Sequence, residues 1–171
     1  MRSLFWTLLT LSFTLYLVMV LWSLPKIAAG AGGLMPFDMR PGGYDLPQAQ
    51  AFLAALTNPA RGFYLTVQHR LDTVYPALMG LTLALGLWLL FTGWLRLGLI
   101  AVVVTGKSAD YLENAAVARL LLADAVDAEL VAAASRWTIL KSVCDMGAMS
   151  ALILGALWVL WRRYRIKKAG A

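Results

Sequence analysis

The sequence predicts an all-α integral membrane protein, a four-helix transmembrane bundle with one long outer loop that contains a short helix. Composition is the first reason, because 61% of the 171 residues are hydrophobic and only 14% are charged. Soluble domains are about half apolar and about a quarter charged. The second reason is that four apolar runs are long enough to cross a bilayer, which takes roughly 20 residues. The third is that the longest stretch between these runs is rich in glycine and proline, which indicates a loop.

The predicted spans and the segments between them make up one membrane domain, residues 1–171. The spans are residues 4–24, 75–95, 97–119 and 137–161, and the helix of the second span begins earlier, near Ala60. The remaining segments are an outer loop at 25–74, an acidic outer hairpin at 120–136 and a basic tail at 162–171. We expect a tight turn at 92–96, between the second and third spans.

The first apolar run has two interpretations. A secretory signal peptide has an apolar core of about 7 to 15 residues, followed by a cleavage site of small residues. Residues 27–31, Ile-Ala-Ala-Gly-Ala, supply small side chains, and cleavage there would leave three spans. The run from Leu4 to Leu24 is nevertheless long enough to span a membrane, so we favour an uncleaved first helix.

The outer loop contains one predicted helix, at about 46–57. Asp45 is a good N-cap residue, Pro47 suits the first turn, and Gln48 stands where a capping-box partner is expected. Asn58 and Pro59 end this helix.

Basic residues orient the predicted bundle. Five of them directly follow the last span, and the positive-inside rule places such a cluster on the cytoplasmic side. With four spans both termini are then cytoplasmic, together with Arg96 in the turn between the second and third spans. The net charge of +6 therefore reflects orientation and contact with the lipid bilayer, and we expect no nucleic-acid partner. The five residues are Arg162, Arg163, Arg165, Lys167 and Lys168.

A polar stretch interrupts the third span between Lys107 and Asn114. Asp110, Glu113 and Asn114 stand at i, i+3 and i+4, so a helix presents them on one face, with Lys107 at its edge. Ionisable groups at membrane depth cost several kcal/mol each and normally face a protein interior or a wet cavity. The sequence therefore predicts that this face points into the bundle.

Other elements supply polar residues at a matching depth. Lys141 and Asp145 lie one turn apart on the fourth span, at the same height as Glu113 and Asp110. We expect Glu113 to pair with Lys141, and Asp110 to have no nearby cation apart from Lys107, which can reach towards the cytoplasmic side instead. A stripe before the second span has the same inward spacing, although a helix end facing water would also explain it. The stripe consists of Arg61, Tyr64, Gln68, Asp72 and Tyr75.

Together these residues form the candidate polar pocket, and part of the loop is a candidate lid over it. The pocket residues are Arg61, Tyr64, Gln68, Asp72, Asp110, Glu113, Asn114, Lys141 and Asp145, and the lid residues are Asp38, Arg40 and Tyr44. We predict Asp72 and Asp110 as its functional pair. The alternative is a purely structural network of ion pairs that fixes helix packing. A stripe of small residues, Gly147, Ala151 and Gly155, indicates close packing inside the bundle.

Metal, haem and disulfide chemistry have little support. The chain has one histidine, His69, which we interpret as an interfacial residue, and one cysteine, Cys144. There is no His-x-x-x-His pair, no P-loop and no GxSxG motif. We therefore predict no metal site and no cofactor, and the sequence favours a protein that is not an enzyme.

Several motifs resemble those of a known protein family. The pattern runs from Phe37-Asp38-Met39-Arg40 and Gly43-Tyr44, through Arg61, Tyr64, Leu71-Asp72 and Tyr75-Pro76, to Asp110-Tyr111-Leu112-Glu113-Asn114. It resembles a family of uncharacterised small bacterial four-span membrane proteins. The resemblance covers roughly Phe37 to Asn114 and implies the bacterial cytoplasmic (inner) membrane, but no activity.

The function we expect is binding. A carboxylate-rich pocket near the outer leaflet suits an accessory or assembly subunit that holds a small ligand, a membrane-protein partner or a second copy of the chain. Two alternatives stay open: a membrane enzyme acting on a lipid or envelope substrate, with Asp72, Asp110 and Glu113 as acid, base or metal ligands, and a small cation or proton carrier.

Overall fold

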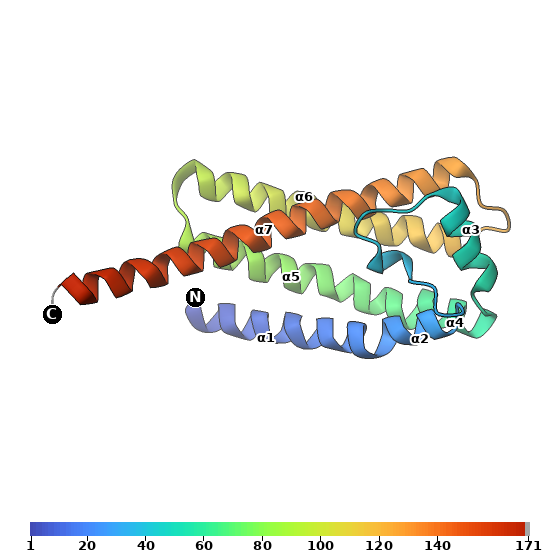
Figure 1. Cartoon of the computed structure of the whole chain (residues 1–171), viewed down its shortest axis with the longest axis horizontal. Coiled ribbons are helices and arrows are strands. Elements are labelled where there is room, and N and C mark those ends of the chain that lie inside the picture. The colour runs from blue at the N-terminus through green and yellow to red at the C-terminus, as the bar shows by residue number, and fades with distance from the viewer. Residues whose placement is uncertain (170–171) are drawn as a thin grey trace.

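The protein is helical throughout the part that the computed structural model describes, residues 1–169 (Figure 1). Helices make up 86% of the structure, and these residues contain no strand. Gly170 and Ala171, at the end of the predicted basic tail, lie outside the described residues. In chain order the elements are α1 (Arg2–Val18), η1 (Met19–Ser23), α2 (Leu24–Ala29), η2 (Phe37–Met39), α3 (Leu46–Ala55), α4 (Asn58–Phe63), η3 (Tyr64–Gln68), α5 (His69–Leu90), α6 (Gly93–Leu122) and α7 (Ala128–Ala169).

Long helical segments lie side by side along the molecule (Figure 1). Residues 2–29 form one continuous segment, α1–η1–α2, and residues 58–90 form another, α4–η3–α5. Helix α6 packs against both α5 and α7, whereas α1 packs mainly along α5. We call one end of the molecule the basic end: it holds the start of α1, the end of α7 and the turn between α5 and α6 (Figure 1). We call the opposite end the loop end: it holds the loop 30–57 and the turn 123–127.

Three helices are long and apolar enough to cross a membrane: Arg2–Ala29, Asn58–Leu90 and Ala128–Ile166. Helix α6 is also long enough, since its 30 residues rise about 45 Å. Its composition is more polar because Lys107, Asp110 and Glu113 stand in its middle, and all three are buried against neighbouring helices. The prediction of an all-helical chain with apolar, membrane-length helices is thus confirmed.

The turn between the second and third long helices differs from the prediction. Helix α5 ends at Leu90 and α6 begins at Gly93, so the chain turns at Phe91 and Thr92 rather than over 92–96. Arg96 belongs to the first turn of α6, where its Nε donates a hydrogen bond to the Phe91 carbonyl at 2.6 Å. Gly93 has a φ of 62°, which suits glycine and lets the helix start directly after the turn.

The loop helix has the predicted capping box. Asp45 Oδ1 accepts a hydrogen bond from the Gln48 amide at 2.9 Å, and Gln48 Oε1 accepts one from the Asp45 amide at 3.2 Å. Helix α3 then packs Phe52 and Leu53 with Phe37 into a core shared with the loop ends of α6 and α7. The loop is therefore fixed over the helices by its own apolar core.

Two of the three residues of the predicted small-residue stripe pack inside the bundle. Gly155 makes a tight contact with Phe91, and Ala151 packs against an apolar core that includes Leu83, whereas Gly147 faces open space. The close approach of α6 and α7 occurs at Gly106, where an added Cβ would lie 2.7 Å from Cys144 Cβ and 3.1 Å from Asp145 Oδ1. The sequence did not single out Gly106, which stands on α6 outside the predicted stripe.

Candidate functional site

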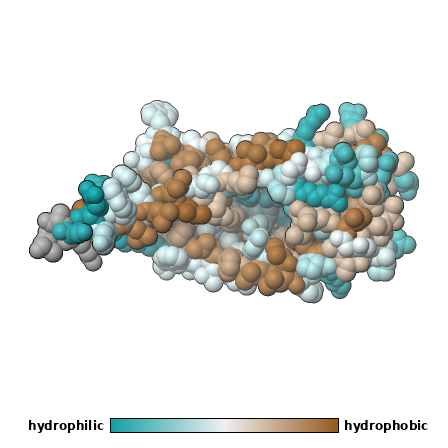
Figure 2. All heavy atoms as spheres, in the orientation of Figure 1, coloured by the Kyte–Doolittle hydropathy of each residue, from teal (hydrophilic) through white to brown (hydrophobic). Residues whose placement is uncertain are grey.

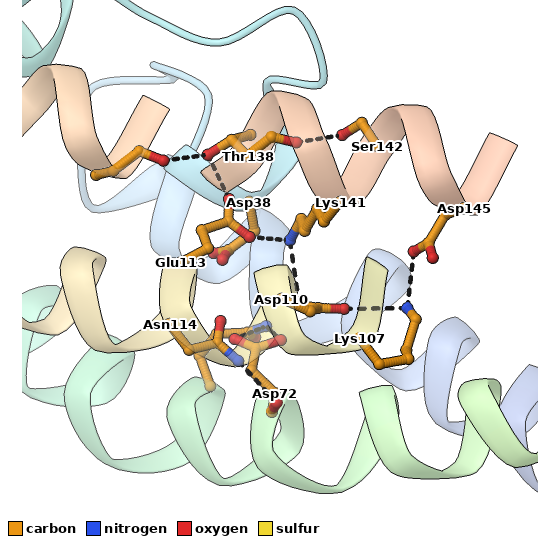
Figure 3. Close-up of polar contacts among 12 residues, drawn as sticks. Asp38, Asp72, Lys107, Asp110, Glu113, Asn114, Thr138, Lys141, Ser142 and Asp145 are labelled. Atoms are coloured by element: carbon orange, nitrogen blue, oxygen red, sulfur yellow. Dashed lines mark hydrogen bonds and ion pairs between the residues drawn. The ribbon is translucent and has the colours of Figure 1, made fainter. Parts of the chain in front are cut away.

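A continuous row of ion pairs joins α6 and α7 (Figure 3). Lys107 Nζ lies 2.7 Å from Asp145 Oδ2 and 3.2 Å from Asp110 Oδ2. Lys141 Nζ lies 3.4 Å from the other Asp110 oxygen and also pairs with Glu113, as the sequence predicts. Asp110 therefore bridges two lysines, and the prediction that it lacks a nearby cation on α7 is wrong.

The α6 residues of the row are buried, most completely Glu113, whereas Lys141 and Asp145 of α7 are half-buried. Glu113 is 0% exposed, and its Oε1 also accepts a hydrogen bond from Thr138 Oγ1 at 2.6 Å. Lys107 is 8% exposed and points to the row rather than towards the basic end, contrary to the alternative that we expected. Gly80 makes room for it, because a Cβ there would lie 2.8 Å from Lys107 Cγ.

A second polar branch connects α5 to the first helical segment. Gln68 Nε2 donates to both carboxylate oxygens of Asp72 at 3.0 Å, and the Ser23 hydroxyl donates to Gln68 Oε1 at 2.6 Å. Asn114 Nδ2 donates to the backbone carbonyl of Asp72 at 2.8 Å. Asp72 is 7% exposed, and it has no salt bridge within the described part of the chain.

Two π-helical segments form this second branch. Ser23 is the last residue of η1 and Gln68 is the last residue of η3, and the two segments contact each other. π-helical turns are rare and often occur at functional sites. Sequence reasoning identified Gln68 from its spacing but missed Ser23, since a single serine in an apolar run carries no signal.

One lid residue reaches the polar cluster. Asp38 accepts a short hydrogen bond from the Tyr64 hydroxyl, and its side chain lies beside Glu113 and Lys141 (Figure 3). Tyr64 is only 3% exposed and lies on η3, one turn before Gln68. The loop thus contributes a carboxylate to the cluster.

The other two lid residues stabilise the loop instead. The Arg40 guanidinium donates to the Met35 carbonyl at 2.9 and 2.6 Å and lies over the rings of Phe37, Tyr44 and Phe52. Burial lowers the pKa of Arg40 and raises the pKa of Tyr44. Neither side chain makes a salt bridge with the cluster.

Arg61 makes no salt bridge with the carboxylates, although the sequence analysis includes it in the candidate pocket. Its guanidinium donates to the Leu121 carbonyl at 2.6 Å and to the Leu53 carbonyl at 3.3 Å. The Leu121 carbonyl belongs to the last turn of α6, which leaves carbonyls without helical donors. Arg61 therefore caps a helix end, whereas the stripe residues that follow it point inward.

A cavity of about 280 Å³ lies against the cluster. Five charged residues line it: Asp38 of η2, Asp72 of α5, Asp110 of α6, and Lys141 and Asp145 of α7. Tyr16, Met19 and Val20 of the first segment form the opposite wall. Since α1 packs along α5 rather than α7, a recess separates α1 from α7 on this face of the molecule (Figure 2).

The cluster contains more carboxylates than cationic side chains. Five acidic side chains, Asp38, Asp72, Asp110, Glu113 and Asp145, share two lysines, Lys107 and Lys141. Among residues 1–169 no group of three or more His, Cys, Asp or Glu side chains has an arrangement that could hold a metal ion. The unpaired carboxylates suit hydrogen-bond donors and cationic groups, which a cavity of this size can admit.

No protein-family model matches this chain, and no curated protein and no solved structure matches it. The resemblance to small bacterial four-span proteins stays a prediction, and the candidate site rests on its geometry.

Proposed function

We propose that this chain is a multi-pass protein of the bacterial cytoplasmic membrane, a four-helix transmembrane bundle that binds a small ligand in its polar cavity. In this proposal it acts as a binding or accessory subunit. The observation that carries the proposal is the 280 Å³ cavity between charged side chains, roofed by the loop. A network that only joined helices would have no need of such a space, because protein interiors are close-packed.

Burial of the charges of α6 supports counting it as the fourth span. Lys107, Asp110 and Glu113 form ion pairs with Lys141 and Asp145 of α7 and with one another, so these charges have partners inside the protein. Charge at the helix ends supports the orientation. Arg2, Arg96 and Arg162 lie at the basic end, and Asp124 and Asp127 lie at the loop end, so the cavity belongs to the outer-leaflet half.

Ligand binding accounts for the cluster better than transport of a cation or proton across the membrane. The charged groups occupy the loop half of the helices, whereas the other half has an apolar core of Leu83, Leu87, Val103 and Ala148 beside one neutral polar pair, Ser12 and Thr82. A transport path would need polar groups through that core. Because this apolar core lies between the polar cavity and the basic end, the arrangement fits a ligand that enters and leaves from the same side.

Non-denaturing mass spectrometry of the protein, extracted in mild detergent from its own membrane, tests this proposal. We expect wild type to retain a small molecule that is lost in Asp72→Asn and in Val20→Trp, which fills the cavity. Asp124→Asn, in the exposed turn, is the matched control and should retain it. The proposal is wrong if wild type retains nothing, or if all four proteins retain the same species.

A further inference from the structure

A second cavity continues the polar one towards the basic end. Its volume is about 430 Å³, and its lining is almost entirely apolar, including Leu9, Phe13, Met79 and Met149. Tyr16 and Tyr75 line both cavities, and their rings lie 6.3 Å apart. The recess between α1 and α7 is therefore polar at one end and apolar along the rest of its length.

The recess closes before it reaches the basic end. Phe5 of α1 and Leu152 of α7 both approach Gly86 of α5, where an added Cβ would lie 2.8 Å from Phe5 Cε2 and 2.6 Å from Leu152 Cδ1. The space between α1 and α7 is thus a blind groove. Its open side faces outward between the two helices, in the plane where lipid chains would lie if the helices span a membrane.

The charges at the polar end favour a cation. Both lysines of the cluster are already paired, Lys107 with Asp145 and Asp110, and Lys141 with Glu113 and Asp110. Asp72 and Asp38 line the cavity without a salt bridge in residues 1–169, and accept hydrogen bonds only from the neutral groups of Gln68 and Tyr64. An anionic head group would face these carboxylates, whereas an ammonium offers three N–H donors and a compensating charge.

We propose that the ligand is an amine-headed membrane lipid. Its ammonium lies between Asp72 and Asp38, and one aliphatic chain passes Tyr16 and Tyr75 into the apolar cavity. The inference rests on the proposed function, that the polar cavity binds a ligand, and adds the class of ligand and its route through the side of the bundle. The apolar cavity, at about 430 Å³, is within the usual range for ligand pockets, about 300 to 1,000 Å³.

Competition between two lipids tests this inference. The protein in nonionic detergent is mixed with equal amounts of dioleoyl phosphatidylethanolamine and dioleoyl phosphatidylglycerol, and bound lipid is counted by non-denaturing mass spectrometry. We expect wild type to prefer the ethanolamine lipid roughly tenfold or more, since a hydrogen bond to a charged group contributes about 1.5 to 3 kcal/mol. Asp72→Asn should abolish the preference, and Met79→Trp, which fills the apolar cavity, should reduce binding of both lipids.

Two control variants, together with melting curves of all the variants, distinguish a loss of lipid binding from a loss of folding. Asp124→Asn lies in the exposed turn, and Leu154→Trp adds the same indole to a side chain that is 66% exposed on α7. Both should keep the preference of wild type. Equal binding of the two lipids by wild type, or preference for the glycerol lipid, overturns the inference.

Ethylammonium, which has the charge without the chain, separates this inference from the proposed function. If it raises the melting temperature of wild type but not of Asp72→Asn while neither lipid binds, the cavity binds a small cation and the lipid inference is wrong. If neither lipid binds and ethylammonium has no effect, the cation specificity is wrong as well. The proposed function then depends on the retained-ligand experiment alone.

Discussion

Glu113 and Asp72 are both buried carboxylates, but only Glu113 has a cationic partner. We expect Glu113→Gln to lower the free energy of unfolding by about 3 to 5 kcal/mol, since one partner of a buried ion pair is removed. Asp72→Asn should keep or raise stability, because it removes a carboxylate that has no salt bridge and the amide oxygen can still accept from Gln68. Melting curves in mild detergent measure both. Equal losses in the two variants would mean that the cluster is only structural.

Tyr44 offers a second test at the scale of one residue. Its ring packs 4.7 Å from that of Phe37, but its buried hydroxyl makes no hydrogen bond. The Thr138 hydroxyl lies nearby and donates to Glu113 at 2.6 Å, but it is not hydrogen-bonded to Tyr44. A buried polar group without a partner costs about 1 to 3 kcal/mol, so we expect Tyr44→Phe to be as stable as wild type or more stable.

Tyr44→Ala is the matched control for the ring. It removes a large buried side chain and should destabilise the loop by about 3 to 5 kcal/mol, as measured by the same melting curves. Clear destabilisation by Tyr44→Phe would show that the hydroxyl has a partner in solution.

Helical spacing and depth identified most of the residues of the cluster, but not which side chains pair with one another. Spacing fixes the face of a helix on which Asp110 lies, whereas its partners depend on the rotamers of two long lysines. Arg61 has the spacing of the inward stripe, yet its long side chain reaches backbone carbonyls instead. Thr138 gave no signal, since hydroxyls commonly donate within their own helix.

At the scale of helices, the contact between α6 and α7 depends on Gly106. We expect Gly106→Val to lower stability by about 1 to 3 kcal/mol, because its side chain would overlap Cys144 and Asp145 and force the helices apart. Gly147→Val on α7 is the control, since nothing lies within 4 Å of a Cβ there. The measured quantity is the melting temperature, and equal effects of the two variants would contradict this packing.

Helix boundaries show what local sequence can predict. The capping box of α3 was found because Asp45, Pro47 and Gln48 act within one turn. The sequence placed the turn after α5 at 92–96, because Gly93 can stand in a turn as well as at the start of a helix. In the structure Gly93 starts α6, and the hydrogen bond from Arg96 to the Phe91 carbonyl stabilises this start. The π-helical segments were not foreseen, because they depend on contacts between η1 and η3 that lie 45 residues apart at Ser23 and Gln68.

At the scale of the whole molecule, the proposed topology depends on the distribution of charge between the two ends. The basic end carries arginines from three separate segments, and the loop end carries the acidic turn around Asp124 and Asp127. If the whole bundle were inserted in the opposite orientation, these arginines would lie outside, which contradicts the positive-inside rule. The polar cavity would then belong to the inner-leaflet half, and its ligand would come from the cytoplasmic side.

Reporter fusions decide the orientation. A reporter that is active only outside the cytoplasm should be silent after the C-terminus and active when inserted at Gly33 or at Ala125, two exposed positions at the loop end. Gly33 has nothing within 4 Å of its Cβ position, so an insertion there should leave the loop core intact. An insertion at Thr92, in the turn between α5 and α6, should be silent, as the C-terminal fusion is. Activity at both Thr92 and Ala125 would mean that α6 does not cross the membrane. Activity at Thr92 and at the C-terminus, with silence at Gly33 and Ala125, would mean that the bundle has the opposite orientation.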